Sequence, residues 1–136
     1  MIGLLDSSGL IWIRRHPGTV SELDAHVIAG DVALCDPVTL EVLRGMESAA
    51  AYLAAEEALA GMPHVPISPR AFQRARAIQR DLAALPGPRH RSIAPTDLLV
   101  AAAAIEAELP ILHRDRDFEA IAEVTGQPQR WVGPRA

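Results

Sequence analysis

Short apolar runs alternate with longer helical segments along this chain. Four of the runs have the length and composition of buried strands, and they cover residues 1–5, 32–35, 110–113 and 129–132. The segments with helical spacing or composition lie over residues 7–13, 19–29, 37–44, 47–60, 68–82, 94–105 and 117–124. This alternation predicts an α/β fold built around a mostly parallel sheet.

Turn and capping residues set the expected ends of these elements. Ser7 or Ser8 is placed to cap the first helix, and Asp36, followed by proline, is placed to cap the third. Residues 64–67 predict a short edge strand, because proline is tolerated at sheet edges. Residues 86–91 have turn composition and predict an exposed, mobile loop. The helix over 68–82 is expected to bury four apolar side chains: Phe72, Ala75, Ile78 and Leu82.

Length and composition favour one helix-rich domain, residues 1–136, with enough chain to bury a core. Hydrophobic residues make up 49% and aromatic residues 4%, and alanine supplies much of the apolar content. The lone cysteine, Cys35, cannot form an internal disulfide and is expected to be a small buried side chain. The longest apolar helical candidate, around residues 98–105, is shorter than the ~20 residues of a bilayer span. Because the start of the chain also lacks leader features, we expect a cytoplasmic protein without a membrane segment.

All 13 basic residues are arginines, and the sequence contains no lysine. Phosphate-binding loops with a Gly-Lys-Ser/Thr motif and Schiff-base enzymes both need a lysine, so both classes are excluded. The net charge of 13 − 17 = −4 disfavours general affinity for nucleic acid, which depends on phosphate neutralisation. Any such contact must be local, for example through Arg14 and Arg15. A second arginine cluster over residues 70–80 equally fits a solvated helix face.

Four acidic residues lie where an α/β fold gathers its ligands. Asp6 and Asp115 each follow an apolar strand, and ligand sites in open α/β sheets lie beyond the carboxyl ends of strands. Glu41 and Asp97 lie in helical segments expected to pack beside those strands. Each acid alone has a structural explanation, as a helix cap, a first-turn residue or a surface residue. Together they predict a shared carboxylate site.

Carboxylates gathered in this way suit Mg²⁺ or Mn²⁺, which prefer oxygen ligands and keep several waters. Such an ion stabilises charge on phosphoryl oxygens and lowers the pKa of a water that attacks in line. The predicted chemistry is therefore phosphodiester hydrolysis by a metal-dependent nuclease. His113 also suggests a zinc site with Asp115 and Asp117, but tetrahedral zinc sites usually carry more His or Cys ligands than this segment supplies.

Four segments carry a family resemblance: LLDSS at 4–8, PVTLEVLRG at 37–45, TDLLVAAAA at 96–104 and LHRDRDFE at 112–119. In this order they resemble the PIN-domain ribonucleases, specifically the toxins of VapBC-type toxin–antitoxin pairs, over nearly the whole chain. One departure is Ser7, where members often have threonine, and the hydroxyl is kept. The resemblance implies a PIN-like three-layer sandwich, in which helices flank a short, mostly parallel central sheet.

Taken position by position, the resemblance implies a catalytic pocket formed by four acids: Asp6, Glu41, Asp97 and Asp115. Asp6, Asp97 and Asp115 would contact the metal directly or through water, and Ser8 would assist from the first loop. Glu41 would either hold a water beside the metal or help deprotonate the nucleophile. Asp117 would either reach the metal or cap the following helix, and we favour the cap.

The resemblance also implies an RNA substrate, Mg²⁺ or Mn²⁺ as cofactor, a cognate VapB-type antitoxin and a homodimer. The antitoxin's carboxy-terminal segment would lie as a helix in an apolar groove between the helices over 19–29 and 47–60, with a basic residue reaching the carboxylates. Apolar helix surface near Trp12 and the small side chains of the alanine-rich helices also favour a dimer.

Other classes of protein fit less of the sequence. A phosphatase of the haloacid dehalogenase type also begins with an apolar strand that ends in aspartate. It generally needs a second aspartate two residues later and a lysine, whereas this chain has Ser8 and no lysine. A phosphoacceptor receiver domain needs the same lysine. A non-catalytic binding module on the PIN fold would tolerate loss of the acids, and here all four are present.

Overall fold

A four-stranded parallel sheet lies at the centre of the computed structural model, which describes residues 1–135. The strands are β1 (Gly3–Leu5), β2 (Val32–Ala33), β3 (Ile111–His113) and β4 (Gln129–Trp131), in the spatial order β2-β1-β3-β4. Every strand pairing is parallel. The residues of β1, β2 and β3 are all buried, as expected for continuous apolar runs inside a parallel sheet.

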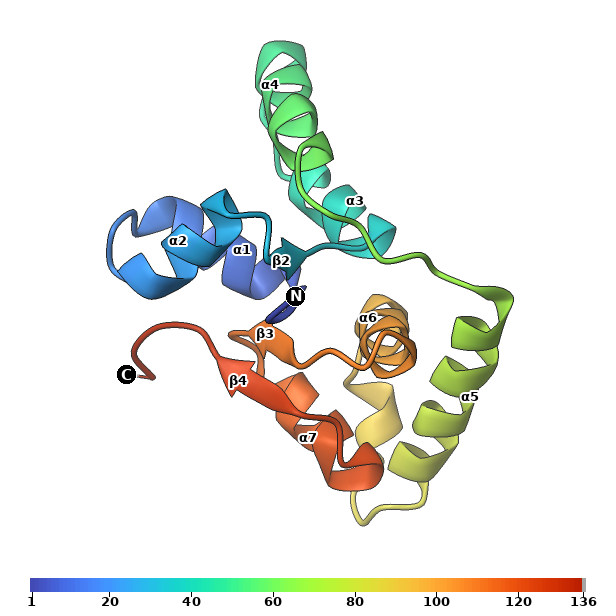
Figure 1. Cartoon of the computed structure of the whole chain (residues 1–136). Helices are drawn as coiled ribbons and strands as arrows, with labels where there is room; N and C mark the ends of the chain where they lie inside the picture. The colour runs from blue at the N-terminus through green and yellow to red at the C-terminus, as the bar shows by residue number, and fades with distance from the viewer. Residues whose placement is uncertain (136) are drawn as a thin grey trace.

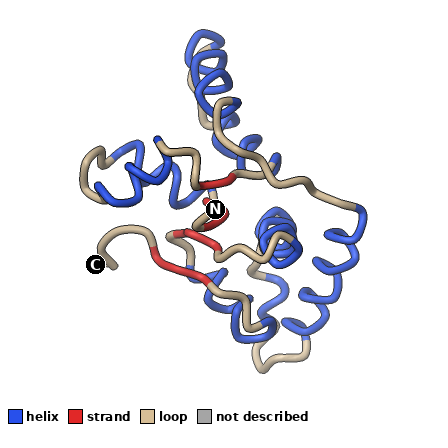
Figure 2. The backbone as a smooth tube through the Cα atoms, in the orientation of Figure 1, coloured by secondary structure: helices blue, strands red, loops and turns tan. Residues whose placement is uncertain are grey.

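Helices connect the parallel strands and cover both faces of the sheet. They are α1 (Ser7–Arg15), α2 (Ser21–Ile28), α3 (Asp36–Arg44), α4 (Ala49–Ala60), α5 (Pro69–Ala83), α6 (Pro95–Glu106) and α7 (Arg116–Thr125), with a 3-10 turn η1 at Arg89–Arg91. Figure 1 shows α1 and α2 on one side of the sheet, α5 and α6 on the other, and α4 projecting beyond α3. Figure 2 shows the strands as a small central strip among much longer helices. The predicted three-layer α/β sandwich is confirmed, and no helix of residues 1–135 combines the length and apolarity needed to cross a bilayer.

Two helix starts differ from the sequence-based expectation. Asp6, rather than either serine, caps α1, because its side chain accepts a hydrogen bond from the backbone N–H of Ser8 at 3.0 Å. Asp36 is already the first residue of α3, so the cap position falls to the buried Cys35, which makes no side-chain capping bond. As the cap of α1, Asp6 has a structural role in addition to any chemical one.

The connections between elements also differ in detail. Residues 64–67 form only an isolated bridge between His64 and Leu34 instead of an edge strand. Pro63 and Pro66 flank this bridge, and neither residue has the N–H that would extend a ladder. The expected loop over residues 86–91 ends in η1, where Arg89 donates to Glu123 of α7 at 2.6 Å. That part of the segment is therefore tied to the fold.

Alanines control how closely α5 approaches α6. The buried residues of α5 are Ala71, Ala75, Ile78 and Leu82. They face the α5–α6 contact, where α6 buries a run of four alanines at residues 101–104. Phe72, which was expected in the core, is 54% exposed. Because the small side chain of Ala71 is the one buried, the backbones of α5 and α6 can pack closely, and the adjacent Phe72 then points outward.

Gly9 brings the start of α1 against β3. A Cβ atom at Gly9 would lie 2.9 Å from Leu5 Cδ1 and 3.2 Å from the carbonyl oxygen of Leu112. Only glycine allows this approach without a shift of the neighbouring backbone or side chain. The close packing places Asp6, at the start of α1, beside the end of β3.

Candidate active site

The carboxyl ends of the two central strands both lead to an aspartate. Asp6 follows β1 directly, and Asp115 lies two residues beyond the end of β3. The backbone N–H of Asp6 donates to the carbonyl of Leu112 at 2.9 Å, so the two strand ends are neighbours. The parallel register thus brings residues more than one hundred positions apart to the same edge of the sheet.

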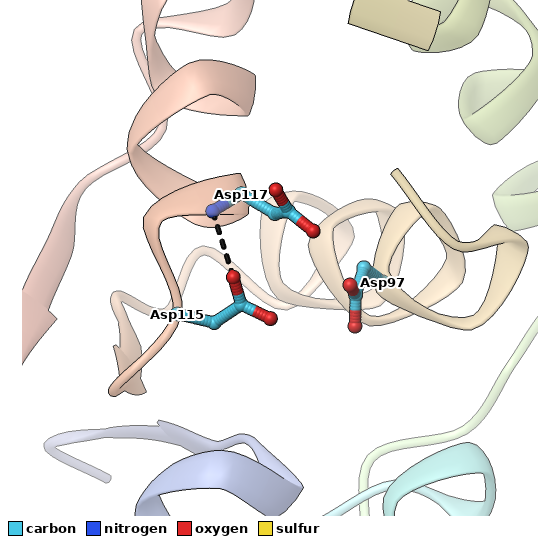
Figure 3. Close-up of side chains that lie close together, drawn as sticks. All are labelled: Asp97, Asp115 and Asp117. Atoms are coloured by element: carbon cyan, nitrogen blue, oxygen red, sulfur yellow. Dashed lines mark hydrogen bonds between the residues drawn. The ribbon is translucent and has the colours of Figure 1, made fainter. Parts of the chain in front are cut away.

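Asp97, Asp115 and Asp117 form the tightest acidic cluster among the described residues. Each offers one carboxylate oxygen, and these three atoms lie within 4.8 Å of one another. Figure 3 shows the three side chains converging on one space between α6 and the start of α7. Asp97 is only 8% exposed and stands in the first turn of α6, where the helix dipole favours a negative charge.

Burial and the charges of neighbouring carboxylates raise the pKa values of Asp97 and Asp6. Burial, and to a lesser extent the charges of Asp6, Asp115, Glu41 and Asp117, together raise the pKa of Asp97 to about 8. The pKa of Asp6, which is 2% exposed, is also raised by burial, while hydrogen bonds from Ser8 oppose the shift and the charge of Glu41 adds to it. These acids therefore share one electrostatic environment, which a bound cation would relieve.

Asp117 does not cap α7, contrary to the expectation from the sequence. Asp115 occupies the cap position, and its Oδ1 accepts the N–H of Asp117 at 2.9 Å, the dashed line in Figure 3. The roles are exchanged because α7 already begins at Arg116, and Asp115 keeps the extended backbone (φ −136°, ψ 121°) that a cap residue needs. The Asp117 carboxylate instead joins the cluster, where burial and then the charge of Asp115 raise its pKa.

Two serines hold the acids that come first in the chain. Ser8 Oγ donates to Asp6 Oδ2 at 2.7 Å, to the same oxygen that accepts the Ser8 N–H. Ser7 Oγ donates to Glu41 Oε2 at 2.6 Å and so links the start of α1 to α3. The contribution of Ser7 was missed, because the sequence shows a hydroxyl after the strand-end aspartate but not which acid it contacts.

Both ring nitrogens of His113 form hydrogen bonds within the fold. Its Nδ1 accepts the N–H of Asp115 at 3.0 Å, so the proton lies on Nε2, which donates to Gln129 Oε1 at 2.6 Å. The ring is 0% exposed. With both nitrogens in use, the ligand atoms that the described cluster gathers are the carboxylate oxygens of Asp97, Asp115 and Asp117. This donor set suits a hard divalent cation better than tetrahedral zinc.

Sequence comparisons find the same family along most of the chain. Residues 3–124 match the PIN domain. Ribonuclease VapC18 of Mycobacterium tuberculosis is 38% identical over 111 residues, which cover 82% of this chain and 81% of that protein. Ribonuclease VapC51 of the same organism is 37% identical over 131 residues, which cover 96% and 93% of the two chains.

Solved structures show the same fold. A structure of VapBC2 from Rickettsia felis bound to a promoter DNA fragment contains a chain that superposes with a TM-score of 0.74 at 15% identity, covering 96% of this chain and 98% of that one. For VapBC-5 from Mycobacterium tuberculosis the TM-score is 0.61 at 25% identity, with 97% and 98% covered. The phosphatase and receiver-domain alternatives gain no support from these comparisons. The chain therefore belongs to the PIN-domain family and, within it, to the VapC ribonucleases.

Proposed function

We propose that this chain is a metal-dependent endoribonuclease, the toxin of a toxin–antitoxin pair, with Asp6, Glu41, Asp97 and Asp115 as its catalytic acids. The VapC ribonucleases among its relatives support RNA as the substrate and hydrolysis of a phosphodiester bond as the reaction. One structural observation carries the assignment of the site. Oxygens of Asp97, Asp115 and Asp117 lie within 4.8 Å of one another, in the electrostatic environment of the buried Asp6.

The donor chemistry fits Mg²⁺ or Mn²⁺, and we infer that Asp6, Asp97 and Asp115 hold the ion, with Asp117 as an accessory group. When bound, such an ion stabilises charge at the scissile phosphate and lowers the pKa of a water. The raised pKa of Asp97 supports this inference, because a carboxyl group that resists ionisation among other acids ionises readily beside a cation.

Hydrogen bonds within the site leave one oxygen of each strand-end acid for a ligand. Asp6 Oδ2 accepts two hydrogen bonds from Ser8, so Oδ1 is the oxygen presented to an ion. Asp115 Oδ1 caps α7, so Oδ2 has the same role there. Ser7 orients Glu41 through Oε2, and Oε1 remains to accept a proton from the attacking water. Ser8 thus acts by holding Asp6.

The direct test is cleavage of an RNA mixture by the purified chain. We expect cleavage with Mg²⁺ or Mn²⁺, none in excess chelator, and none with the Asp6→Asn variant, which keeps the side-chain volume. Asp81→Asn, at an exposed position of α5, is the matched control and should retain full cleavage. Undiminished cleavage in chelator, or by Asp6→Asn, would remove the metal-site assignment.

A VapB-type antitoxin is the proposed partner, and the expected apolar groove is present. A hollow of about 650 Å³ lies between α1, α2 and α4, and its lining includes Leu10, Arg14, Val27, Ala55, Ala58 and Leu59. The solved structures of similar fold are VapBC assemblies, which supports a peptide from such a partner as the occupant. Arg14 also lines a second hollow of about 310 Å³ that reaches Glu41. A helix in the first hollow could therefore continue toward the acids and deliver a basic side chain.

Coexpression with the neighbouring reading frame tests this proposal. The complex should be inactive and should regain cleavage after proteolysis of the partner. Ala58→Glu places a charge in the hollow without filling the core and should weaken the complex, whereas Ala60→Glu, exposed on the same helix outside the hollow, should not. Equal binding of the two variants would place the partner elsewhere.

A homodimer remains a proposal, and the structure removes one motive for it. The Trp12 ring stacks on the His16 ring, with 4.4 Å between the two ring centroids, and the Arg114 guanidinium carbon lies 4.7 Å from the Trp12 ring centroid. The Trp12 ring is therefore engaged within the molecule. Leu40 and Phe72, 66% and 54% exposed, are the side chains to test instead. Light scattering should show a dimer that Leu40→Glu dissociates and Leu53→Glu, exposed on α4, does not. A parent chain that is monomeric at all concentrations would contradict the proposal.

A further inference from the structure

Arg114, between β3 and α7, is held by contacts from three parts of the chain. Its Nη1 donates to the carbonyls of Val132 and Pro134 at 2.7 Å and 2.8 Å. Its guanidinium carbon lies 4.7 Å from the ring centroid of Trp12 and 5.2 Å from that of Trp131. We call this arrangement, formed by Arg114, the two tryptophans and the two carbonyls, the Arg114 clamp. It joins α1, β4 and the segment that follows β4.

The clamp is connected to both strand-end acids. The backbone N–H of Arg114 donates to Ser8 Oγ at 2.9 Å, and Ser8 Oγ donates to Asp6 Oδ2 at 2.7 Å. Asp115 is the next residue in the chain. Trp12 lies on α1, the helix that Asp6 caps. The contact between Arg114 and Trp12 therefore ties the element carrying one acid to the element carrying the other.

We propose that Arg114 is a positioning residue that sets the spacing of the Asp6 and Asp115 carboxylates. The proposal rests on the proposed function, because the spacing matters for catalysis only if these acids hold an ion. Arg114 is poorly placed to bind RNA itself. Both hydrogens of Nη1 are directed at carbonyl oxygens and the guanidinium packs against two indole rings, whereas a phosphate contact needs the planar fork exposed.

A substitution at Gly133, which lies outside the acidic site, is a second and independent way to perturb the clamp. It has a positive φ of 71°, and a Cβ there would lie 2.6 Å from Cη2 of Trp12. Any side chain at position 133 must therefore displace either the Trp12 ring or the segment that supplies the two carbonyls to Arg114. Gly87 has nearly the same backbone conformation, φ 69°, and a Cβ there would meet no atom within 4 Å. Gly87→Ala is thus a matched control for backbone strain alone.

The main experiment compares Arg114→Met with Arg130→Met, which removes the same charge from an exposed position on β4. Calorimetry should show that Arg114→Met binds Mn²⁺ about 10-fold more weakly, as is usual when support of a metal ligand is lost. In RNA cleavage, kcat should fall while KM changes by less than about twofold, because the site and not substrate binding is disturbed. Arg130→Met should match the parent in all three quantities.

Arg114→Lys separates positioning from charge. Lysine keeps the charge but lacks the planar fork that contacts the carbonyls and the indoles, so this variant should resemble Arg114→Met. Full recovery by lysine, or a rise in KM with unchanged kcat, would show that the charge acts on RNA and would overturn the proposal. Unchanged Mn²⁺ affinity and kcat in Arg114→Met would overturn it equally.

Two further measurements decide the proposal if Arg114→Met does not fold or if the proposed function is wrong. Gly133→Ala should weaken Mn²⁺ binding in the same direction, and Gly87→Ala should not; equal effects would overturn the proposal. If the parent chain neither cleaves RNA nor binds Mn²⁺, the proposed function fails. The positioning role is then decided by amide hydrogen exchange at Ser8, whose N–H is bound to Asp6. Exchange should accelerate in Gly133→Ala, and parent-like exchange would refute the role.

Discussion

The acidic cluster and the Arg114 clamp both include residues that directly follow β3, and the electrostatic environments of their charged groups are opposite. In the cluster, burial and like charge raise the pKa values of Asp97, Asp6 and Asp117, and the described residues include no ion pair to any of the three. In the clamp, one guanidinium donates hydrogen bonds to two carbonyls and packs against two aromatic rings. The molecule thus places its least favourable charges next to one of its best-supported charges.

This difference shows how the fold keeps a destabilised site in shape. Carboxylates that repel one another tend to move apart, and they stay together only if their backbones are held by other contacts. Here the backbones are held by the parallel register of β1 and β3, by the close approach of α1 at Gly9, and by the clamp. A cation would then bind to a site whose geometry is already fixed, which favours its affinity.

The largest effect is expected from removing one charge of the cluster. Asp97→Asn should reduce RNA cleavage by at least about 100-fold, since it removes a proposed metal ligand and not only the support of one. Circular dichroism should show an unchanged fold, because asparagine has nearly the same volume. The comparison with Asp81→Asn separates the site from general charge effects. Full activity of Asp97→Asn would mean that the cluster is not catalytic.

The acids were predictable from the sequence because a simple rule connects them. A buried parallel strand is recognisable as a short apolar run, and ligands collect at its carboxyl end, so Asp6 and Asp115 could be paired from the sequence alone. Asp97 followed from its place at the start of an apolar helix. The fold class followed from the same alternation of strands and helices.

The clamp was not predictable, because its contacts join residues that no local pattern relates. Trp12 reads as a core or interface residue, and only the packing of α1 on β3 brings it to Arg114. The exchange of roles between Asp115 and Asp117 depended on the residue at which α7 begins. Phe72 was misplaced because hydrophobic size favours burial, whereas close helix packing favoured Ala71. In each case tertiary packing decided between locally equivalent choices.

The second prediction concerns stability against pH without a divalent cation. The folded pKa of Asp97, about 8, lies above its ordinary value of 3.8, so the native state binds more protons between these values. The contribution of Asp97 to the free energy of unfolding is fully present below pH 3.8 and falls as pH rises, until it is lost above about pH 8. In chelator, the parent chain should therefore lose melting temperature from pH 6 to pH 9 relative to Asp97→Asn.

The control uses the same variant at both ends of this range. Asparagine ionises in neither state, so its stabilising effect relative to the parent should be smaller at pH 6, where folded Asp97 is neutral, than at pH 9, where folded Asp97 is charged, by at least about 1 kcal/mol. Adding Mn²⁺ at pH 9 should raise the melting temperature of the parent and not that of Asp97→Asn. Identical pH profiles for the two chains would show that Asp97 does not carry the raised pKa.

The smallest effect on Mn²⁺ affinity and melting temperature is expected from substituting Asp117, the accessory acid of the cluster. Asp117→Asn removes a charge that raises the pKa of Asp97, and it leaves the Asp115 cap of α7 in place. We expect Mn²⁺ affinity to fall by no more than about 10-fold and the melting temperature at pH 9 to rise less than in Asp97→Asn. Asp115→Asn keeps the cap, because asparagine caps a helix as well as aspartate, yet it should lose Mn²⁺ binding like Asp97→Asn. If calorimetry ranks Asp117→Asn with these two variants, Asp117 is a direct ligand, and the distinction between ligands and accessory acid in the cluster is wrong.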